Sequence, residues 1–140
     1  MNGLLSVKNL IIDLITRAAA QAQESGRLPA VSLPPIVIEH PQNTAHGDYA
    51  ASVPLKMART TGMKPMDIAA AIIEFIPTAP EIKCVKVAPP GFINFTLSDA
   101  WIIEQVETII SSGENYGNID LGQNKKLQIE YVSANPTGPI

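Results

Sequence analysis

The sequence predicts an α+β fold in which a small antiparallel sheet packs against helices in two layers. Three observations support this prediction. The N-terminal region has apolar residues at helical spacing, and two apolar runs separated by Pro-Pro-Gly indicate an antiparallel hairpin. Helices and strands are mixed in the order α-β-α-α-β-β-α-β. The chain has 140 residues, 46% of them hydrophobic, which is enough to bury a core without disulfide bonds.

The first predicted helix covers residues 4–25. Its apolar side chains recur at three- and four-residue steps, which places them on one face. Gly26 ends this helix, and a proline-rich loop follows. Residues 36–38 are Ile-Val-Ile, a β-branched run that predicts a short buried strand, and residues 40–49 predict a polar loop.

Two further helices are predicted after this loop. Ser52 can cap a helix that runs to about residue 59, and Thr-Thr-Gly stops it. The next helix begins at Pro65, has Asp67 in its first turn where the helix dipole favours an acid, and ends before Pro77. With the first helix, they are expected to cover one side of the sheet.

A β-hairpin and a final helix complete the predicted domain. Residues 82–88 and 92–97 predict two strands joined by the Pro-Pro-Gly turn. Ser98 can cap a helix that closes at Gly113. Residues 127–132 predict one more strand.

Side chains of the strand 92–97 alternate between two chemical types. Ile93, Phe95 and Leu97 suit a core, whereas an aromatic ring, an amide and a hydroxyl point to the other face. An aromatic ring can stack on an unpaired RNA base, and an amide can hydrogen-bond its edge. The alternative is an ordinary solvent-exposed face. The polar-face residues are Phe92, Asn94 and Thr96.

The net charge of −3 argues against a protein that binds nucleic acid through bulk charge. Basic residues exceed acidic ones in the segment 51–90, whereas 91–120 contains five acids and no base. Lys83 and Lys86 lie on the strand that neighbours Phe92 and Asn94, so they are within reach of phosphates. Uneven charge can also be a solvated surface and nothing more.

The tetrapeptide His46-Gly47-Asp48-Tyr49 could suggest acid–base catalysis. No nucleophile accompanies it, and neighbours in sequence rarely form a catalytic triad. We therefore favour a structural role, with Gly47 at positive φ and Asp48 accepting hydrogen bonds from backbone donors ahead of the next helix.

Composition excludes several classes of protein. A single cysteine, Cys84, leaves no internal disulfide and no multi-cysteine metal site. No apolar run approaches the roughly 20 residues that cross a bilayer. We expect a soluble cytoplasmic protein with no metal site and no membrane contact.

The C-terminal residues 130–139 gather polar groups within a stiff loop. A carboxylate lies on the predicted strand, and hydroxyl and amide groups follow in a turn rich in proline and glycine. Open α/β sheets bind ligands at this place, beyond the carboxyl end of a strand. The alternative is a plain loop.

Three segments resemble one family. Residues 129–140 resemble the lead-in to the His-x-Gly-His motif of bacterial-type arginyl-tRNA synthetases, which are class I aminoacyl-tRNA synthetases. Residues 46–50 and 91–95 resemble motifs of the additional N-terminal domain of the same family, in the same order. The lead-in consists of Ala134, Asn135, Pro136, Thr137, Gly138 and Pro139.

The resemblance implies a domain organisation. Residues 1–122 correspond to the N-terminal tRNA-recognition domain. Residues 123–140 correspond to the first strand and loop of a Rossmann-type catalytic domain, truncated before the motif histidines. We expect no catalytic residue in this segment and no aminoacylation by the 140 residues alone.

The resemblance also implies function. The full-length enzyme is expected to be an arginine–tRNA ligase, a monomer that charges tRNA(Arg) with arginine using ATP and Mg²⁺, with neither cofactor bound to this fragment. Phe92 and Asn94 are expected to contact a base of the tRNA D-loop at the elbow. Glu130, Ser133 and Asn135 are expected to line the arginine pocket, Glu130 by charge complementarity to a cationic substrate.

Two alternatives stay open on the sequence. One is a stand-alone RNA-binding module that never belonged to a synthetase. The other is an α+β interaction domain whose open sheet face binds protein. A His-x-Gly-His motif encoded directly after Ile140 would favour the synthetase.

Overall fold

The computed structural model describes residues 3–118, 122–123 and 125–129. Their centre is a four-stranded sheet in the order β1-β2-β4-β3, in which every neighbouring pair is antiparallel. The predicted α+β class is confirmed. The strands are β1 (Ile38–Glu39), β2 (Tyr49–Ala51), β3 (Ile82–Ala88) and β4 (Phe92–Leu97).

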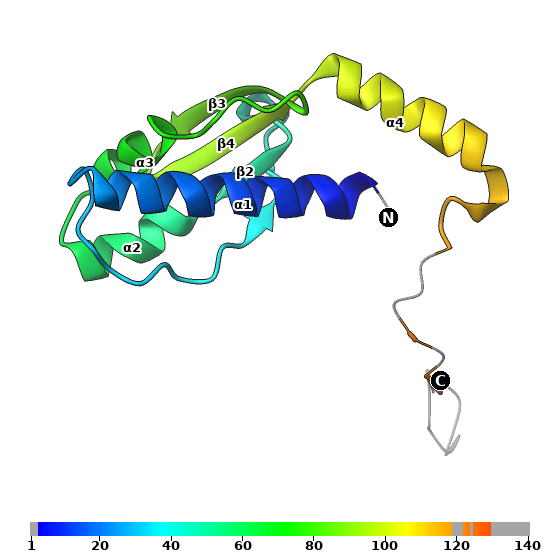
Figure 1. Ribbon diagram of the computed structural model, residues 1–140, viewed down its shortest axis with the longest axis horizontal. Helices are drawn as coiled ribbons and strands as arrows, with labels where there is room; N and C mark the ends of the chain where they lie inside the picture. The colour runs from blue at the N-terminus through cyan, green and yellow to red at the C-terminus, as the bar shows by residue number, and fades with distance from the viewer. Residues whose placement is uncertain (1–2, 119–121, 124, 130–140) are drawn as a thin grey trace, which may run out of the picture.

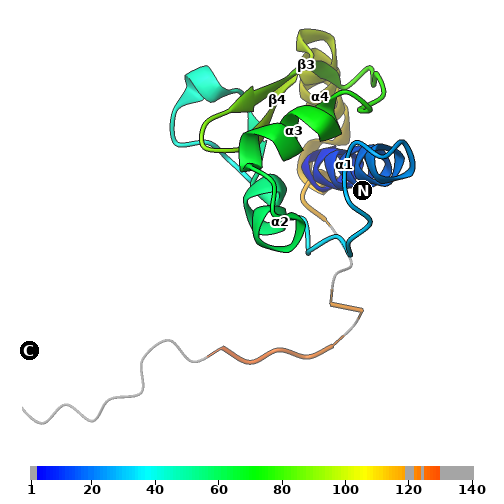
Figure 2. The same cartoon turned by 90° about the vertical axis from the view of Figure 1, so that its left-hand side faces the viewer.

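Three helices cover one face of this sheet, as Figures 1 and 2 show from two sides. They are α1 (Gly3–Glu24), α2 (Val53–Thr61) and α3 (Pro65–Ile73). The fourth helix, α4 (Asp99–Ser112), runs away from the body in Figure 1. Two short 3-10 helices, η1 (Thr44–His46) and η2 (Gly113–Asn115), complete the described elements.

The core lies between the sheet and the three helices. In β4, Ile93 and Phe95 are fully buried and Leu97 is 6% exposed, so the predicted core face of this strand is confirmed. Alternation along a strand sends every second side chain to one face, which explains the pattern. The helices contribute Ile11, Ile15, Met57, Ile68 and Ile72.

The predicted buried strand 36–38 is mostly wrong. Only Ile38 belongs to β1 and is buried, whereas Val37 is 44% exposed. β1 is an edge strand that pairs with β2 alone, through Ile38 with Ala51 and Glu39 with Ala50. Pro35, which lacks an N–H, precedes it closely, so the ladder cannot extend far in that direction.

The predicted polar loop 40–49 contains two elements that the sequence did not predict. η1 lies in its middle, and β2 begins at its last residue. Asn43 caps η1 by accepting a hydrogen bond from the Ala45 amide at 2.9 Å. The loop is therefore an ordered structure that leads directly into the sheet.

The two predicted serine caps have different outcomes. Ser98 caps α4, since its Oγ accepts a hydrogen bond from the Trp101 amide at 3.0 Å. Ser52 occupies the N-cap position of α2 but makes no capping hydrogen bond with its side chain. The prediction that Ser52 caps this helix through its hydroxyl is wrong.

The last predicted strand, 127–132, is not formed in its described part. Residues 127–129 have no strand structure, and Leu127 is 83% exposed. Figure 2 shows residues 125–129 running away from the sheet, where a strand has no neighbour to pair with. The rest of that strand lies outside the described residues, and the division at 122/123 stays a prediction. Within the described residues, no helix has the length and hydropathy of a membrane span.

Candidate nucleic-acid interface

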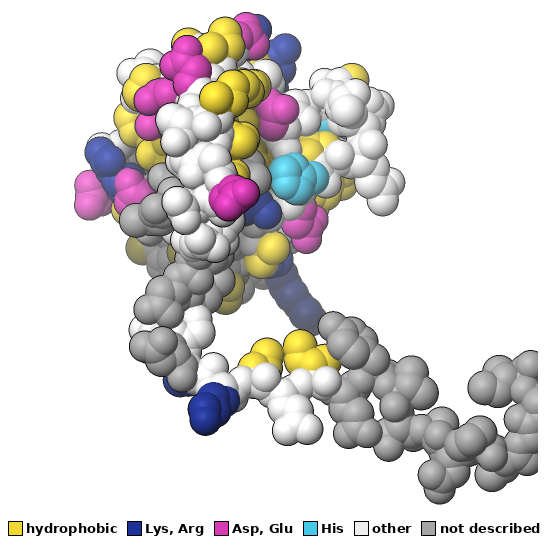
Figure 3. All heavy atoms as spheres, turned by 90° about the vertical axis from the view of Figure 1, so that its right-hand side faces the viewer, with side chains coloured by type: hydrophobic (Ala, Val, Ile, Leu, Met, Phe, Trp, Pro, Cys, Tyr) yellow, Lys and Arg dark blue, Asp and Glu magenta, His cyan; other side chains and the backbone are white. Residues whose placement is uncertain are grey.

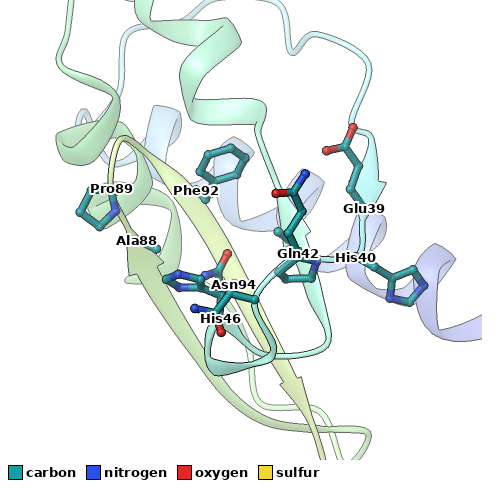
Figure 4. Close-up of a pocket in the computed structure, with 11 residues that line it drawn as sticks. Glu39, His40, Gln42, His46, Ala88, Pro89, Phe92 and Asn94 are labelled. Atoms are coloured by element: carbon teal, nitrogen blue, oxygen red, sulfur yellow. The ribbon is translucent and has the colours of Figure 1, made fainter.

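A pocket of about 440 Å³ lies between the β3–β4 hairpin and the loop that precedes β2 (Figure 4). We call it the base pocket. The loop supplies one wall and the two strands supply the other. Its lining includes Glu39, His40, Gln42, His46, Phe92 and Asn94.

Asn94 is the unusual residue of this pocket. It is 8% exposed, and among the described residues it is the only buried side chain classed as polar or charged. No side-chain hydrogen bond joins it to any described residue. Among the described residues no buried side-chain nitrogen or oxygen lacks a hydrogen-bond partner, so the unpaired Asn94 amide opens into the pocket and is available to a ligand there. The sequence predicted the correct face but placed Asn94 on an open surface, whereas the loop wall buries it.

Phe92 lies at the mouth of the hairpin and is half-buried. It pairs with Ala88 across the β3–β4 ladder, and both residues line the base pocket. Gly91, at φ +150°, allows the turn to touch α3, because a Cβ there would collide with Pro65.

The loop wall is attached to β4 by Asp48. The Asp48 amide donates to the Phe95 carbonyl at 2.9 Å, and the Asp48 carboxylate accepts from the Leu97 amide at 2.8 Å. Gly47 has φ +88°, and a Cβ on it would lie 2.7 Å from the Phe95 oxygen. The structural roles predicted for Gly47 and Asp48 are confirmed, except that Asp48 binds a strand amide and not the start of the next helix.

Both histidines of the chain line the base pocket, which the sequence did not predict. The ring Nδ1 of His40 lies 2.9 Å from the Asp48 carbonyl oxygen, and its ring centroid lies 4.6 Å from that of Tyr49. Burial, with a smaller contribution from Asp48, raises the pKa of Tyr49 above its usual value of 10.0. Their position in the sequence could have indicated this, because both histidines lie in the segment that directly precedes β2.

The two predicted phosphate-contacting lysines are in different environments. Lys86 pairs with Asn94 across the ladder and lines a second pocket of about 120 Å³. Lys83 donates to the Asp99 carboxylate at 2.8 Å, and this hydrogen bond raises the pKa of Lys83. An irregularity between Ile82 and Cys84 interrupts the strand register at Lys83. The structure therefore brings Lys86, but not Lys83, to the site.

The surface of α4 is acidic and apolar, unlike the surface near Lys86. α4 carries acids and no base, and Figure 3, viewed from this side, shows carboxylates and apolar side chains over it. Such a surface repels phosphate. The exposed aliphatic residues of α4 are Ile102, Ile103, Val106, Ile109 and Ile110.

The predicted arginine-binding residues Glu130, Ser133 and Asn135 lie outside the described residues, as do residues 134–139 of the predicted motif lead-in. In the described ranges, no group of His, Cys, Asp and Glu side chains could hold a metal ion.

Comparisons with known proteins agree on one family. The family model described as arginyl tRNA synthetase N terminal domain matches residues 9–97. The arginine–tRNA ligase of Dehalococcoides mccartyi strain CBDB1 is 49% identical over 140 residues, which are all of this chain and 25% of that protein. The arginine–tRNA ligase of Moorella thermoacetica is 40% identical over 139 residues, 99% of this chain and 25% of that protein.

A solved structure supports the fold. The crystal structure of arginyl-tRNA synthetase from Plasmodium falciparum matches with a TM-score of 0.52 and 19% identity, covering 67% of this chain and 17% of that one. The chain spans about a quarter of the length of the curated relatives it matches. The family match excludes the first of the two alternatives left open by the sequence, a module unrelated to the synthetases. The chain belongs to the arginyl-tRNA synthetase N-terminal domain family.

Proposed function

We propose that this domain binds tRNA at its elbow by taking an unpaired base of the D-loop into the base pocket. The observation that carries the proposal is Asn94, a largely buried residue whose amide has no partner among the described residues and opens into the pocket that Phe92 also lines. The ring would stack on the base, and the amide would hydrogen-bond its edge. An unpaired base fits this arrangement because its faces and edges are free.

We propose further that the domain serves a full-length arginine–tRNA ligase, a cytoplasmic monomer. That enzyme would activate arginine with ATP and Mg²⁺ and transfer it to tRNA(Arg). The names of the relatives support this activity. Glu130, Ser133 and Asn135 would line the arginine pocket of the catalytic domain. Lys83 would contribute general attraction to RNA, reduced by its partner Asp99.

The test is the affinity of the chain for arginine tRNA after single substitutions. Phe92→Ala removes a stacking platform and should weaken binding by about 1–3 kcal/mol. Asn94→Ala removes base-edge hydrogen bonds and should cost a similar amount, about 1–3 kcal/mol. Ile110→Ala on α4, where the side chain is 74% exposed and outside the pocket, is the control and should bind like the parent.

Melting temperature is measured for each variant, because a loss of binding counts only when the fold is retained. If Phe92→Ala and Asn94→Ala both fold and bind tRNA like Ile110→Ala, the base pocket is not the RNA site and the proposal fails.

A further inference from the structure

We propose that the second pocket, which we call the side pocket, binds the phosphate group of the same nucleotide whose base enters the base pocket. This inference rests on the proposed function and deepens it. The site would then recognise a nucleotide by base and phosphate together, in two adjoining pockets.

The two pockets are neighbours with common walls. His46, Ala88 and Asn94 line both of them. A group in the side pocket is therefore separated from a group in the base pocket by single side chains. This arrangement suits two parts of one nucleotide, which are joined covalently.

The side pocket has the chemistry of an anion site. Lys86 supplies a cation, the Thr96 hydroxyl and the His46 ring supply further donors, and no carboxylate is among its described lining residues. Lys86 has no ion-pair partner in the described part of the chain, unlike Lys83 with Asp99. A lysine ammonium and hydroxyl donors are common phosphate ligands.

The base pocket is less suited to a phosphate. Glu39 is part of its lining, and Figure 4 shows Glu39 and His40 on the side away from His46 and Asn94. A carboxylate there would repel an anion. Charge therefore favours the phosphate in the side pocket and the uncharged base in the base pocket.

Strand register and Gly47 build the side pocket. Lys86 lies opposite Asn94, and Cys84 lies opposite Thr96, so Lys86, Asn94 and Thr96 share one region of the β3–β4 ladder. Gly47 forms the loop side of the pocket and lies close to Thr96 on β4. A Cβ on Gly47 would be only 3.0 Å from Thr96 Oγ1. The loop can approach β4 this closely only with glycine at that position.

The first experiment measures the affinity of the chain for arginine tRNA at several salt concentrations. Lys86→Ala should weaken binding about tenfold, as expected for a charged hydrogen bond. It should also reduce the slope of log affinity against log salt by about 0.7–0.9, the value for one phosphate contact. Lys83→Ala, on the same strand, is the matched control and should change both quantities less. Thr96→Val keeps the β-branched shape, removes the hydroxyl, and should weaken binding by a smaller factor than Lys86→Ala.

The second experiment locates the phosphate. Synthetic arginine tRNAs carry one uncharged methylphosphonate at successive D-loop positions. At one position the substitution should weaken binding to the parent chain but not to Lys86→Ala, since both changes remove the same interaction.

The outcomes separate the two proposals. If Phe92→Ala weakens binding while Lys86→Ala behaves like Lys83→Ala, the side-pocket inference is overturned and the proposed function stands. The side-pocket inference is also overturned if every methylphosphonate weakens binding equally in the parent and in Lys86→Ala. If neither Phe92→Ala nor Lys86→Ala weakens binding in a folded chain, both proposals fail.

Discussion

The carboxylate of Asp48 accepts a hydrogen bond from the backbone amide of Leu97, with 2.8 Å between Oδ2 and N. The amide of Asp48 itself donates to the carbonyl of Phe95 at 2.9 Å. One residue therefore joins the pocket loop to two places on β4. The shape of the base pocket depends on this attachment, because the loop forms one wall and β4 the other.

Asp48→Ala is expected to lower the free energy of unfolding by about 1–3 kcal/mol, since it leaves the Leu97 amide without its acceptor. Asp48→Asn retains an acceptor oxygen and should cost less. Urea unfolding followed by circular dichroism measures both. Glu107→Gln, at an exposed position within α4, is the control for charge loss alone. Equal stability of Asp48→Ala and the parent would show that this hydrogen bond does not stabilise the fold.

Gly47→Ala is expected to destabilise the fold by more than about 1 kcal/mol, because the site combines positive φ with a close approach to the Phe95 carbonyl. Gly26→Ala is the matched control. Gly26 has φ +76°, similar to the +88° of Gly47, but a Cβ on it would meet nothing within 4 Å. The difference in unfolding free energy between the two variants isolates the steric contact. No difference would show that the loop can move away from β4 without cost.

Phe95→Ala is expected to cost about 3–5 kcal/mol of stability, the usual value for truncating a buried aromatic side chain. Phe95 is fully buried, whereas Phe92 is half-buried at the pocket. Phe92→Ala should therefore melt much closer to the parent. Differential scanning calorimetry of the two variants tests the assignment of strand faces. The assignment is inverted if Phe92→Ala has the larger effect.

Stability at alkaline pH should depend on Tyr49. Its pKa is raised in the folded chain from 10.0, so above about pH 10 the unfolded chain loses the phenol proton while the folded chain keeps it. The folded state should thus lose stability as pH rises through this window. Below it the raised pKa has no effect.

Tyr49→Phe removes this titration and keeps the ring. The difference in unfolding free energy between the parent and Tyr49→Phe should be constant from about pH 7 to 9 and should shift in favour of the variant above about pH 10. The other tyrosines and the lysines titrate in both proteins and cancel. A constant difference up to about pH 11 would show that burial does not perturb this phenol.

The sequence was sufficient to predict the long helices and strands and to assign the side chains of β4 to its two faces. Apolar periodicity predicted α1, and alternation predicted that Phe92 and Asn94 oppose Ile93 and Phe95. The two- and three-residue strands β1 and β2 were not predicted as they are found. Such short segments are defined by pairing, of β1 with β2 and of β2 with β4, and not by local pattern.

The candidate site was predicted only in part, for a similar reason. Lys83 and Lys86 are three residues apart, so strand alternation could already have separated them; in the structure the register irregularity between Ile82 and Cys84 and the ion pair with Asp99 hold Lys83 away from the site. His46 comes to the pocket through the contact of its loop with β4, which is a long-range interaction. Local patterns carry no information about such contacts.

Helix α4 has no buried residue, and Trp101 near its start is half-buried against the core. A 14-residue helix is close to the limit of independent stability in water. Beyond Trp101, its backbone amides should therefore exchange with solvent through fraying of the helix and not through global unfolding. The part of the chain that unfolds cooperatively should therefore end near the first turn of α4, although the helix continues to Ser112.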